Sequence, residues 1–265
     1  MKKIISGWSL IKIYTLLIYI WMFAPIVAVV LLSFNPQQFG SFPMKGFSFR
    51  WYNELMHNAS ILGAFKNSLI LGSLTAILAT AIAVPAALAF VRYNFRGKDF
   101  LNTLLIAPIM IPEVVLGVAL LLFLRWLQQP KSFMLLLVGH VVLTLPYVML
   151  VVQARMVGIK KDYEEAAMSL GASPFQTFLS VTFPLLSPAI FAGMLFAFTI
   201  SFDDVTATLF WSTASQQTVP VKIFGMLRNS ISPEINALGT VMIVLTISLP
   251  LAAGYLARRF ARGSK

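Results

Sequence analysis

Three carboxylates interrupt segments that are otherwise apolar, and their type and placement give this sequence its strongest indication of chemistry. Glu113 lies in the string IPEVVLG, and Asp203 and Asp204 are neighbours in TISFDDVTA. A charge at the centre of a bilayer costs at least about 2.5–3.5 kcal/mol, so such an acid should face the protein interior or an aqueous path. Adjacent helical residues differ by about 100° in direction. We therefore expect one of the two aspartates, and not both equally, to face the path.

The three acids have no basic neighbour at a similar depth. Arg125, near the outer end of its apolar segment, is the nearest candidate. An acidic path without an internal counter-charge suits a cationic substrate, whose ammonium groups would supply the missing partners. The structural alternative is that an acid pairs with a second membrane subunit or stabilises a helix break. For the three acids as a set, the sequence favours the passage of a cation.

Long apolar segments must position these acids. The chain has 265 residues, of which 58% are hydrophobic and 11% are charged, whereas a soluble domain carries about 25% charged residues. A bilayer core about 30 Å thick requires about 20 apolar residues in a helix. The sequence therefore predicts an all-α integral membrane protein that forms a single domain (1–265) with six transmembrane helices: 11–33, 66–91, 100–126, 133–155, 184–210 and 236–257. Glu113 then falls near the middle of the third span.

The basic residues fall unequally on the two sides of these spans. Thirteen Lys and Arg residues lie on the side of the two termini, and seven lie on the other side. Cytoplasmic loops carry an excess of basic residues, so both termini and the segment 156–183 are predicted to face the cytoplasm. The basic residues stand at the ends of apolar runs and form no single patch, which argues against nucleic acid as a partner despite the net charge of +11.

The second span repeats small residues at four-residue spacing, which predicts a helix packed closely inside a bundle. These residues form two series: Gly72, Ala76, Thr80 and Ala79, Ala83, Ala87.

The cytoplasmic segment 156–183 has the sequence signals of two short helices. Asp162 is a suitable N-cap, and Glu164 and Glu165 follow in the first turn, where negative charge is favoured. Gly171 permits the left-handed conformation that ends a helix, and the Ser-Pro pair that follows can begin another. We therefore predict a rigid helical hairpin at the cytoplasmic end of the bundle.

This segment resembles the EAA loop of ABC importer permeases. That loop reads Glu-Ala-Ala, three residues, Gly, nine residues, then Ile-x-Leu-Pro, and EAAMSLGASPFQTFLSVTFP, from Glu165 to Pro184, has the same spacing. Val181 and Phe183 stand for the Ile and the Leu. The resemblance implies a type I ABC importer permease architecture and a coupling hairpin that docks in a groove of an ATPase subunit. The coupling residues would be Glu164, Glu165, Ala166, Ala167 and Gly171.

The chain contains no Gly-rich Lys-Ser/Thr phosphate loop, so the ATPase is expected to be a separate polypeptide. The chain itself would be a non-catalytic subunit without a cofactor, and the partner ATPase would bind ATP and Mg²⁺. His57 and His140 are far apart and lack an acidic or Cys cluster, so no metal site is expected. We interpret His140 as a hydrogen-bond former between helices.

Three further strings resemble the permease subunits of spermidine/putrescine importers. They are FTISFDDV, which begins at Phe198, FSFRWYNEL, which contains Trp51, and SPEINALGT at the start of the sixth span. The resemblance covers nearly the whole chain and implies a polyamine path that involves Glu113, Asp203, Asp204, Trp51 and Ser201. That family commonly has Pro-Asp where this chain has Pro112 and Glu113. The longer side chain leaves the choice between putrescine and spermidine open.

The resemblance also implies a multi-pass protein of the bacterial inner membrane. Its partners would be a second permease in a heterodimer, two ATPase subunits and an extracytoplasmic polyamine-binding protein. Two alternatives stay open: an ABC permease for another small solute, and a secondary carrier that needs no ATPase. Trp51 could offer a cation–π face to a substrate or could be an aromatic residue of the membrane interface.

Overall fold

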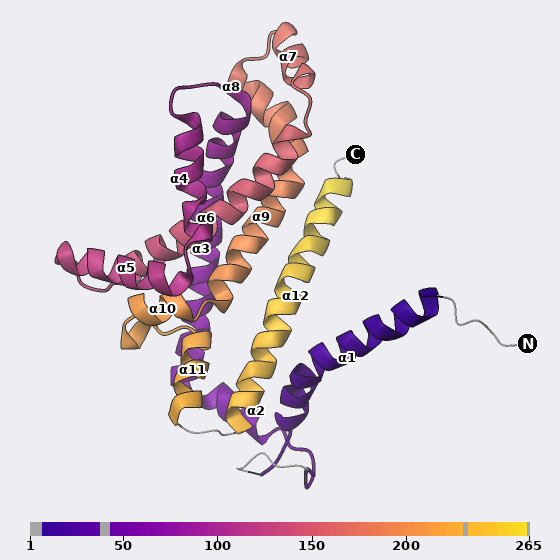
Figure 1. Cartoon of the computed structure of the whole chain (residues 1–265), viewed down its shortest axis with the longest axis vertical. Coiled ribbons are helices and arrows are strands. Elements are labelled where there is room, and N and C mark those ends of the chain that lie inside the picture. The colour runs from indigo at the N-terminus through magenta and orange to yellow at the C-terminus, as the bar shows by residue number, and fades with distance from the viewer. Residues whose placement is uncertain (1–6, 38–42, 230–232, 264–265) are drawn as a thin grey trace, which may run out of the picture. The chain divides into compact units, whose positions relative to one another are not determined.

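Figure 1 shows the computed structural model of the chain, which describes residues 7–37, 43–229 and 233–263. Every regular element of these residues is helical. In chain order the elements are α1 (Gly7–Leu32), α2 (Arg50–His57), α3 (Ala59–Arg92), α4 (Lys98–Met110), α5 (Glu113–Trp126), α6 (Phe133–Val157), α7 (Asp162–Ser169), α8 (Pro174–Thr177), the π-helix η1 (Phe178–Thr182), α9 (Phe183–Asp203), α10 (Thr206–Trp211), the 3₁₀-helix η2 (Ala214–Gln216), α11 (Val219–Asn229) and α12 (Pro233–Gly263).

The chain divides into two compact units. Unit 1 comprises 1–62 with 223–244, and unit 2 comprises 63–222 with 245–265. The helices α3, α11 and α12 contribute residues to both units. The single domain expected from the sequence stays a prediction.

Among the described residues, five helices are long and apolar enough to cross a membrane, and the bent pair α4 and α5 makes six spans if it counts as one. The predicted class, an all-α membrane protein with six spans, is therefore confirmed. The helices α1, α3, α6 and α12 coincide with four predicted spans to within one residue or extend beyond them.

The third predicted span, 100–126, is not one straight helix. It consists of α4 and α5, between which the chain bends by 109°. Ile111 has the extended conformation (φ −94°, ψ 130°) that a following proline favours, and Pro112 has no N–H group to continue the helix. Glu113 is therefore the first residue of α5, at the break between the two halves of this bent pair.

The fifth predicted span, 184–210, also differs from the observed helix. The observed helix begins earlier, because α8, η1 and α9 run on from Pro174. It also ends earlier, at Asp203. Asp204 is extended (φ −67°, ψ 126°), and α10 is a separate helix. In the cytoplasmic segment, Asp162 is the first residue of α7 and not its N-cap, which is Lys161.

The core of unit 2 surrounds α6, most of whose side chains are buried. Gly193 of α9 approaches α6 so closely that a Cβ atom there would lie 3.0 Å from Cγ1 of Val148. The two series of small residues on α3 are all buried: Gly72, Ala76, Thr80, Ala79, Ala83 and Ala87. The predicted close packing of this face is confirmed, while the opposite face of α3 is exposed in this chain.

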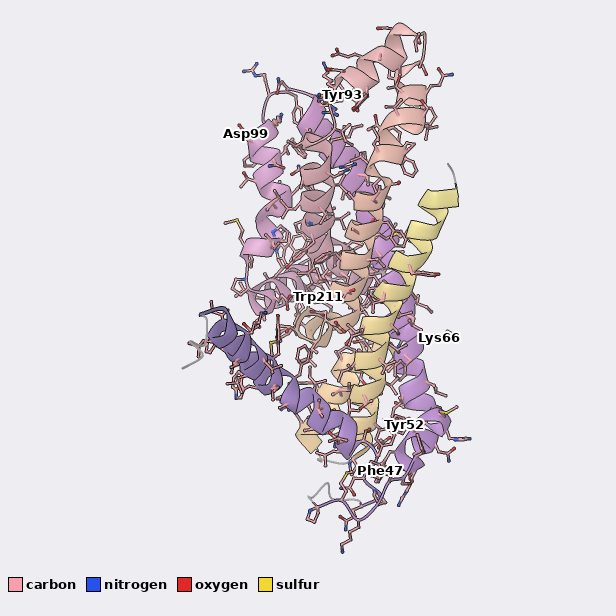
Figure 2. All side chains as sticks on the ribbon, turned by 90° about the vertical axis from the view of Figure 1, so that its right-hand side faces the viewer. Phe47, Tyr52, Lys66, Tyr93, Asp99 and Trp211 are labelled. Atoms are coloured by element: carbon pink, nitrogen blue, oxygen red, sulfur yellow. The ribbon has the colours of Figure 1, made fainter. Side chains whose placement is uncertain are left out.

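Unit 1 is organised around the aromatic loop between α1 and α2. The ring of Phe34 lies 5.3 Å from the rings of Phe49 and Tyr52, between centroids. Hydroxyl groups of Ser33 and Tyr52 are 2.6 Å apart. Figure 2 shows Tyr52 and Phe47 at the same end of the unit. These contacts fix α2 at the end of α1.

Candidate functional site: two pairs of neighbouring acids

In the α7–α8 hairpin (Figure 1), a left-handed glycine ends the first helix, as predicted. Gly171 has φ +92°. Its N–H donates to the carbonyl of Met168 at 3.0 Å, and the N–H of Ala172 donates to the carbonyl of Ala167 at 3.1 Å. These two bonds form a Schellman motif, which satisfies the last carbonyls of α7. The turn is therefore a defined structure that requires Gly171.

The second helix of the hairpin begins with a capping box. Ser173 Oγ accepts a bond from the N–H of Gln176 at 3.3 Å, and Gln176 Oε1 accepts one from the N–H of Ser173 at 2.8 Å. Pro174 occupies the first turn, where its missing N–H has no cost. The helix then runs through η1 into α9, so the hairpin is continuous with the span that carries Asp203.

Glu164 of α7 points into the protein. Arg92 Nε, at the end of α3, donates to Glu164 Oε2 at 2.8 Å, and Thr182 Oγ1, in η1, donates to Glu164 Oε1 at 2.8 Å. Arg92 Nη2 also donates to the carbonyl of Ile159 at 2.9 Å. The side chains of Arg92 and Glu164 are only 12% and 11% exposed. One carboxylate therefore joins α7 to two different spans.

Glu165, the next residue, points outward. Its carboxylate is 55% exposed, and its Oε1 lies 3.0 Å from Nζ of Lys161, one turn earlier. Ala166 is exposed and Ala167 is partly buried. The outer surface of the hairpin also carries Leu170, which is 90% exposed. Of the five predicted coupling residues, Glu164 alone is buried and committed to bonds within the chain.

Asp204 is the C-cap of α9 and lies two residues before the start of α10. Its Oδ2 accepts bonds from the N–H of Thr208 at 2.7 Å and from Thr208 Oγ1 at 2.6 Å, and its Oδ1 accepts one from the N–H of Ala207 at 3.3 Å. These are N–H groups that a helix start leaves without a partner. Asp204 is 8% exposed. It therefore serves as the capping group of a helix break.

His140 of α6 completes the network at this break. The hydroxyl proton of Thr208 goes to Asp204, so Thr208 Oγ1 must accept from His140 Nε2, 3.0 Å away. Ser201 Oγ lies 2.8 Å from His140 Nδ1 and donates to it. A neutral ring protonated on Nε2 satisfies every bond of this chain. The predicted role of His140, hydrogen bonding between helices, is confirmed.

Trp211 fixes α10 against α5 and α6. Its Nε1 donates to the carbonyl of Gly117 at 2.8 Å. A Cβ atom on Gly139 would lie 2.3 Å from the indole, and one on Gly117 would lie 2.9 Å from the ring of Phe210. Figure 2 shows Trp211 among the helices of unit 2. The two glycines therefore form the recesses in which α10 is seated.

Asp203 and Glu113 differ from Asp204 in being exposed in this chain. Asp203 Oδ1 accepts a bond from Thr246 Oγ1 at 3.0 Å. Among the described residues, no Lys or Arg forms an ion pair with any of these three acids. Of the three acids, Asp204 is therefore satisfied by the chain, whereas Asp203 and Glu113 are exposed without a Lys or Arg partner in the described part of the chain.

The other two predicted path residues are buried and bonded within the chain. Ser201 is 2% exposed and bonded to His140. Trp51 is 5% exposed, and its Nε1 donates to the carbonyl of Asn35 at 2.7 Å. The guanidinium of Arg50 lies 4.9 Å from the Trp51 ring centroid. The N–H and one ring face of Trp51 are thus occupied by its own unit, which favours a packing role.

Sequence reasoning missed four residues of these networks: Arg92, Thr182, Thr208 and Trp211. A signal existed for one of them, because an Asp followed four residues later by Thr is a possible capping pair. The partnership of Arg92 with Glu164 joins residues 72 positions apart. No local sequence pattern predicts this pair.

The comparisons with known proteins agree with this architecture. The family model for the binding-protein-dependent transport system inner membrane component matches residues 79–262. The chain belongs to this family. It is therefore a multi-pass component of the inner membrane, in keeping with its apolar helices.

Two curated relatives and one solved structure show how far the likeness extends. The spermidine/putrescine transport system permease protein PotC of Escherichia coli (strain K12) is 36% identical over 93% of this chain and 93% of its own length. The putrescine transport system permease protein PotI of the same strain is 32% identical over 96% of this chain and 92% of its own length. A chain of a bacterial ABC transporter involved in the import of the acidic polysaccharide alginate superposes with a TM-score of 0.75, 16% identity, and coverage of 96% and 97%. The fold is thus that of an ABC importer permease.

Proposed function

We propose that this chain is the transmembrane subunit through which an ATP-driven importer carries polyamines such as putrescine and spermidine. Two relatives whose names include these substrates match almost the entire chain, at 36% and 32% identity. Glu113 and the Asp203–Asp204 pair occur in that shared length. The substrate class therefore follows from both the relatives and the acids.

One observation carries the proposal: two exposed acids, Asp203 at the end of α9 and Glu113 at the start of α5, form no ion pair with Lys or Arg among the described residues. Asp203 has one carboxylate oxygen bonded to Thr246, and Glu113 stands at the start of α5. Ammonium groups carry three donors each and can bind such oxygens directly. A path lined by uncompensated carboxylates attracts cations and repels anions. Asp204 accepts bonds from Thr208 and so stabilises the local structure that carries Asp203.

The proposal is tested with the assembled importer in proteoliposomes, by measuring ATP-dependent uptake of labelled putrescine and spermidine. The double variant Glu113→Gln, Asp203→Asn should lower uptake at least about tenfold, which corresponds to about 1.4 kcal/mol of lost interaction. Asp99→Asn, an exposed acid in the first turn of α4, is the matched control and should transport normally. Unchanged uptake by the double variant would refute the cation path, and uptake without ATP would indicate a secondary carrier.

In the proposed assembly, the α7–α8 hairpin docks on an ATPase through its outward surface. Glu165, Ala166 and Leu170 belong to that surface. The complete importer contains a second permease in a heterodimer, two ATPase subunits and an extracytoplasmic polyamine-binding protein. The ATPase subunits bind ATP and Mg²⁺ and perform all the catalysis, while this chain contributes no catalytic group or cofactor site.

The proposed orientation places both termini and the hairpin in the cytoplasm. The excess of Lys and Arg on that side supports it. Arg96, between α3 and α4, and Lys98, the first residue of α4, then also face the cytoplasm. Figure 2 shows Tyr93 and Asp99, which flank this loop, at the same end of unit 2. Labelling of a cysteine placed at position 170 from the cytoplasmic side only would agree with this topology.

A further inference from the structure

Glu164 joins α7 to α3 and to η1, and these bonds are not needed for the hairpin to dock on an ATPase. Its carboxylate holds Arg92 of α3 on one oxygen and Thr182 of η1 on the other, each at 2.8 Å. Arg92 also holds the carbonyl of Ile159, in the connection that enters α7. The same side chains border a cavity of about 330 Å³ between the hairpin and the end of α3. The hairpin is thus tied to two spans by a buried, charge-assisted network.

We propose that Arg92, Glu164 and Thr182 form the joint that transmits motion of the hairpin into α3 and α9. Glu164 is then a positioning residue that never contacts the ATPase, whereas Glu165 belongs to the docking surface. This inference rests on the proposed function, because it assumes that an ATPase moves the hairpin.

The geometry of the two connected spans supports this role. From Thr182 the helix continues without a break through α9 to Asp203, the exposed acid at the helix break. From Arg92 the helix α3 leads back along the buried series of small residues, where backbones pack closely. Closely packed helices shift as units and do not deform gradually. A displacement of Glu164 therefore reaches both the helix break and the core of unit 2.

A buried ion pair suits this task better than an apolar contact. Removal of one partner leaves the other charge buried without compensation, so the pair stays joined during movement. The direction of its bonds also fixes the rotation of α7. The exposed pair Lys161–Glu165, by contrast, joins α7 only to its own N-cap residue.

The test uses the assembled complex and measures three quantities: ATPase copurification, ATP hydrolysis stimulated by the binding protein, and polyamine uptake. Glu164→Gln should keep the ATPase bound and should lower uptake per ATP hydrolysed about 5- to 150-fold, the usual range of coupling between sites. The charge-swapped double variant Arg92→Glu, Glu164→Arg restores the ion pair but not the bonds of Thr182 and of the Ile159 carbonyl, so it should recover only part of the loss. Glu54→Gln, which removes the exposed Arg50–Glu54 pair, is the matched control and should transport normally.

A structural readout separates the joint from a docking contact. The sequence has no cysteine, so spin labels can be placed at Leu170→Cys and Phe100→Cys, which are exposed positions of unit 2. Glu164→Gln should broaden the distance distribution between these labels in the permease without the ATPase. An unchanged distribution together with normal coupling would overturn the inference, as would loss of the ATPase from the Glu164→Gln complex. If the unaltered complex copurifies with no ATPase, the proposed function itself fails.

Discussion

The two pairs of neighbouring acids, Glu164–Glu165 and Asp203–Asp204, show the same division in two different settings. In each pair one carboxylate is buried and bonded within the chain, and the other is exposed. At the hairpin the buried acid meets a cation, Arg92, at 2.8 Å. At the helix break the buried acid meets only hydroxyl and amide donors and a neutral imidazole.

The difference follows from how each pair is separated in direction. In α7 the helix is continuous, and successive residues diverge by about 100°, so one acid faces inward. At Asp203 the helix stops, and the inward acid becomes the cap of the next helix. A cation at that second position would neutralise a path that we propose to be acidic. In both pairs the inward acid stabilises the structure, and we propose that its outward neighbour meets other molecules.

The largest expected effect comes from removing the inward acid of the helix break. Asp204→Leu leaves the donors of Ala207 and Thr208 without an acceptor. Each unsatisfied buried donor costs about 1–3 kcal/mol of stability. We expect a loss of at least about 3 kcal/mol in stability and a lower melting temperature in detergent. Asp203→Asn, at the outward neighbour, should stay within about 0.5 kcal/mol. Equal melting temperatures for the two variants would contradict the assignment of a structural role to Asp204 and not to Asp203.

A smaller effect is expected at the turn that orients Glu165. Gly171 has φ +92°, and no atom lies within 4 Å of the place a Cβ would take, so a substitution there acts through backbone conformation alone. Gly171→Val costs about 1–2 kcal/mol in the left-handed region and should abolish uptake while membrane insertion continues. Gly171→Asn, which tolerates that region, is the matched variant and should retain most of the uptake. Normal uptake by Gly171→Val would show that the turn does not matter for coupling.

The smallest effect is expected at the exposed pair on the hairpin. Lys161→Ala removes the partner of Glu165, and exposed pairs one turn apart contribute about 0.3–0.5 kcal/mol. The melting temperature should therefore be unchanged within error. Arg92→Ala, which removes the partner of the inward acid, should lower it clearly. A large destabilisation by Lys161→Ala would contradict the assignment of Glu165 to the outer surface.

The sequence predicted features that depend on local or periodic patterns. The membrane spans follow from apolar length, the hairpin turn from Gly171, and the packed face of α3 from small residues at four-residue spacing. The bend of 109° between α4 and α5 was only indicated, since Pro112 loosens a helix without fixing its new direction. The direction depends on α10, seated against Gly117 and Gly139.

The sequence did not predict which acid of each neighbouring pair is buried and which is exposed. Helical geometry shows that Asp203 and Asp204 diverge, but it does not show which one is buried. That choice depends on Thr208 and His140, which lie in different helices. In the same way, the burial of Glu164 depends on Arg92, a partner distant in the chain. Contacts of this kind arise from tertiary packing and leave no periodic trace in the sequence.

The central claim, that the outward acid of the helix break meets a cationic substrate, is tested most directly by reversing its charge. The measurement is ATP-dependent uptake of labelled putrescine and spermidine by the assembled importer carrying Asp203→Lys. The account predicts no detectable uptake, with an unchanged melting temperature and an ATPase that still copurifies. Uptake equal to that of the unaltered importer would contradict it.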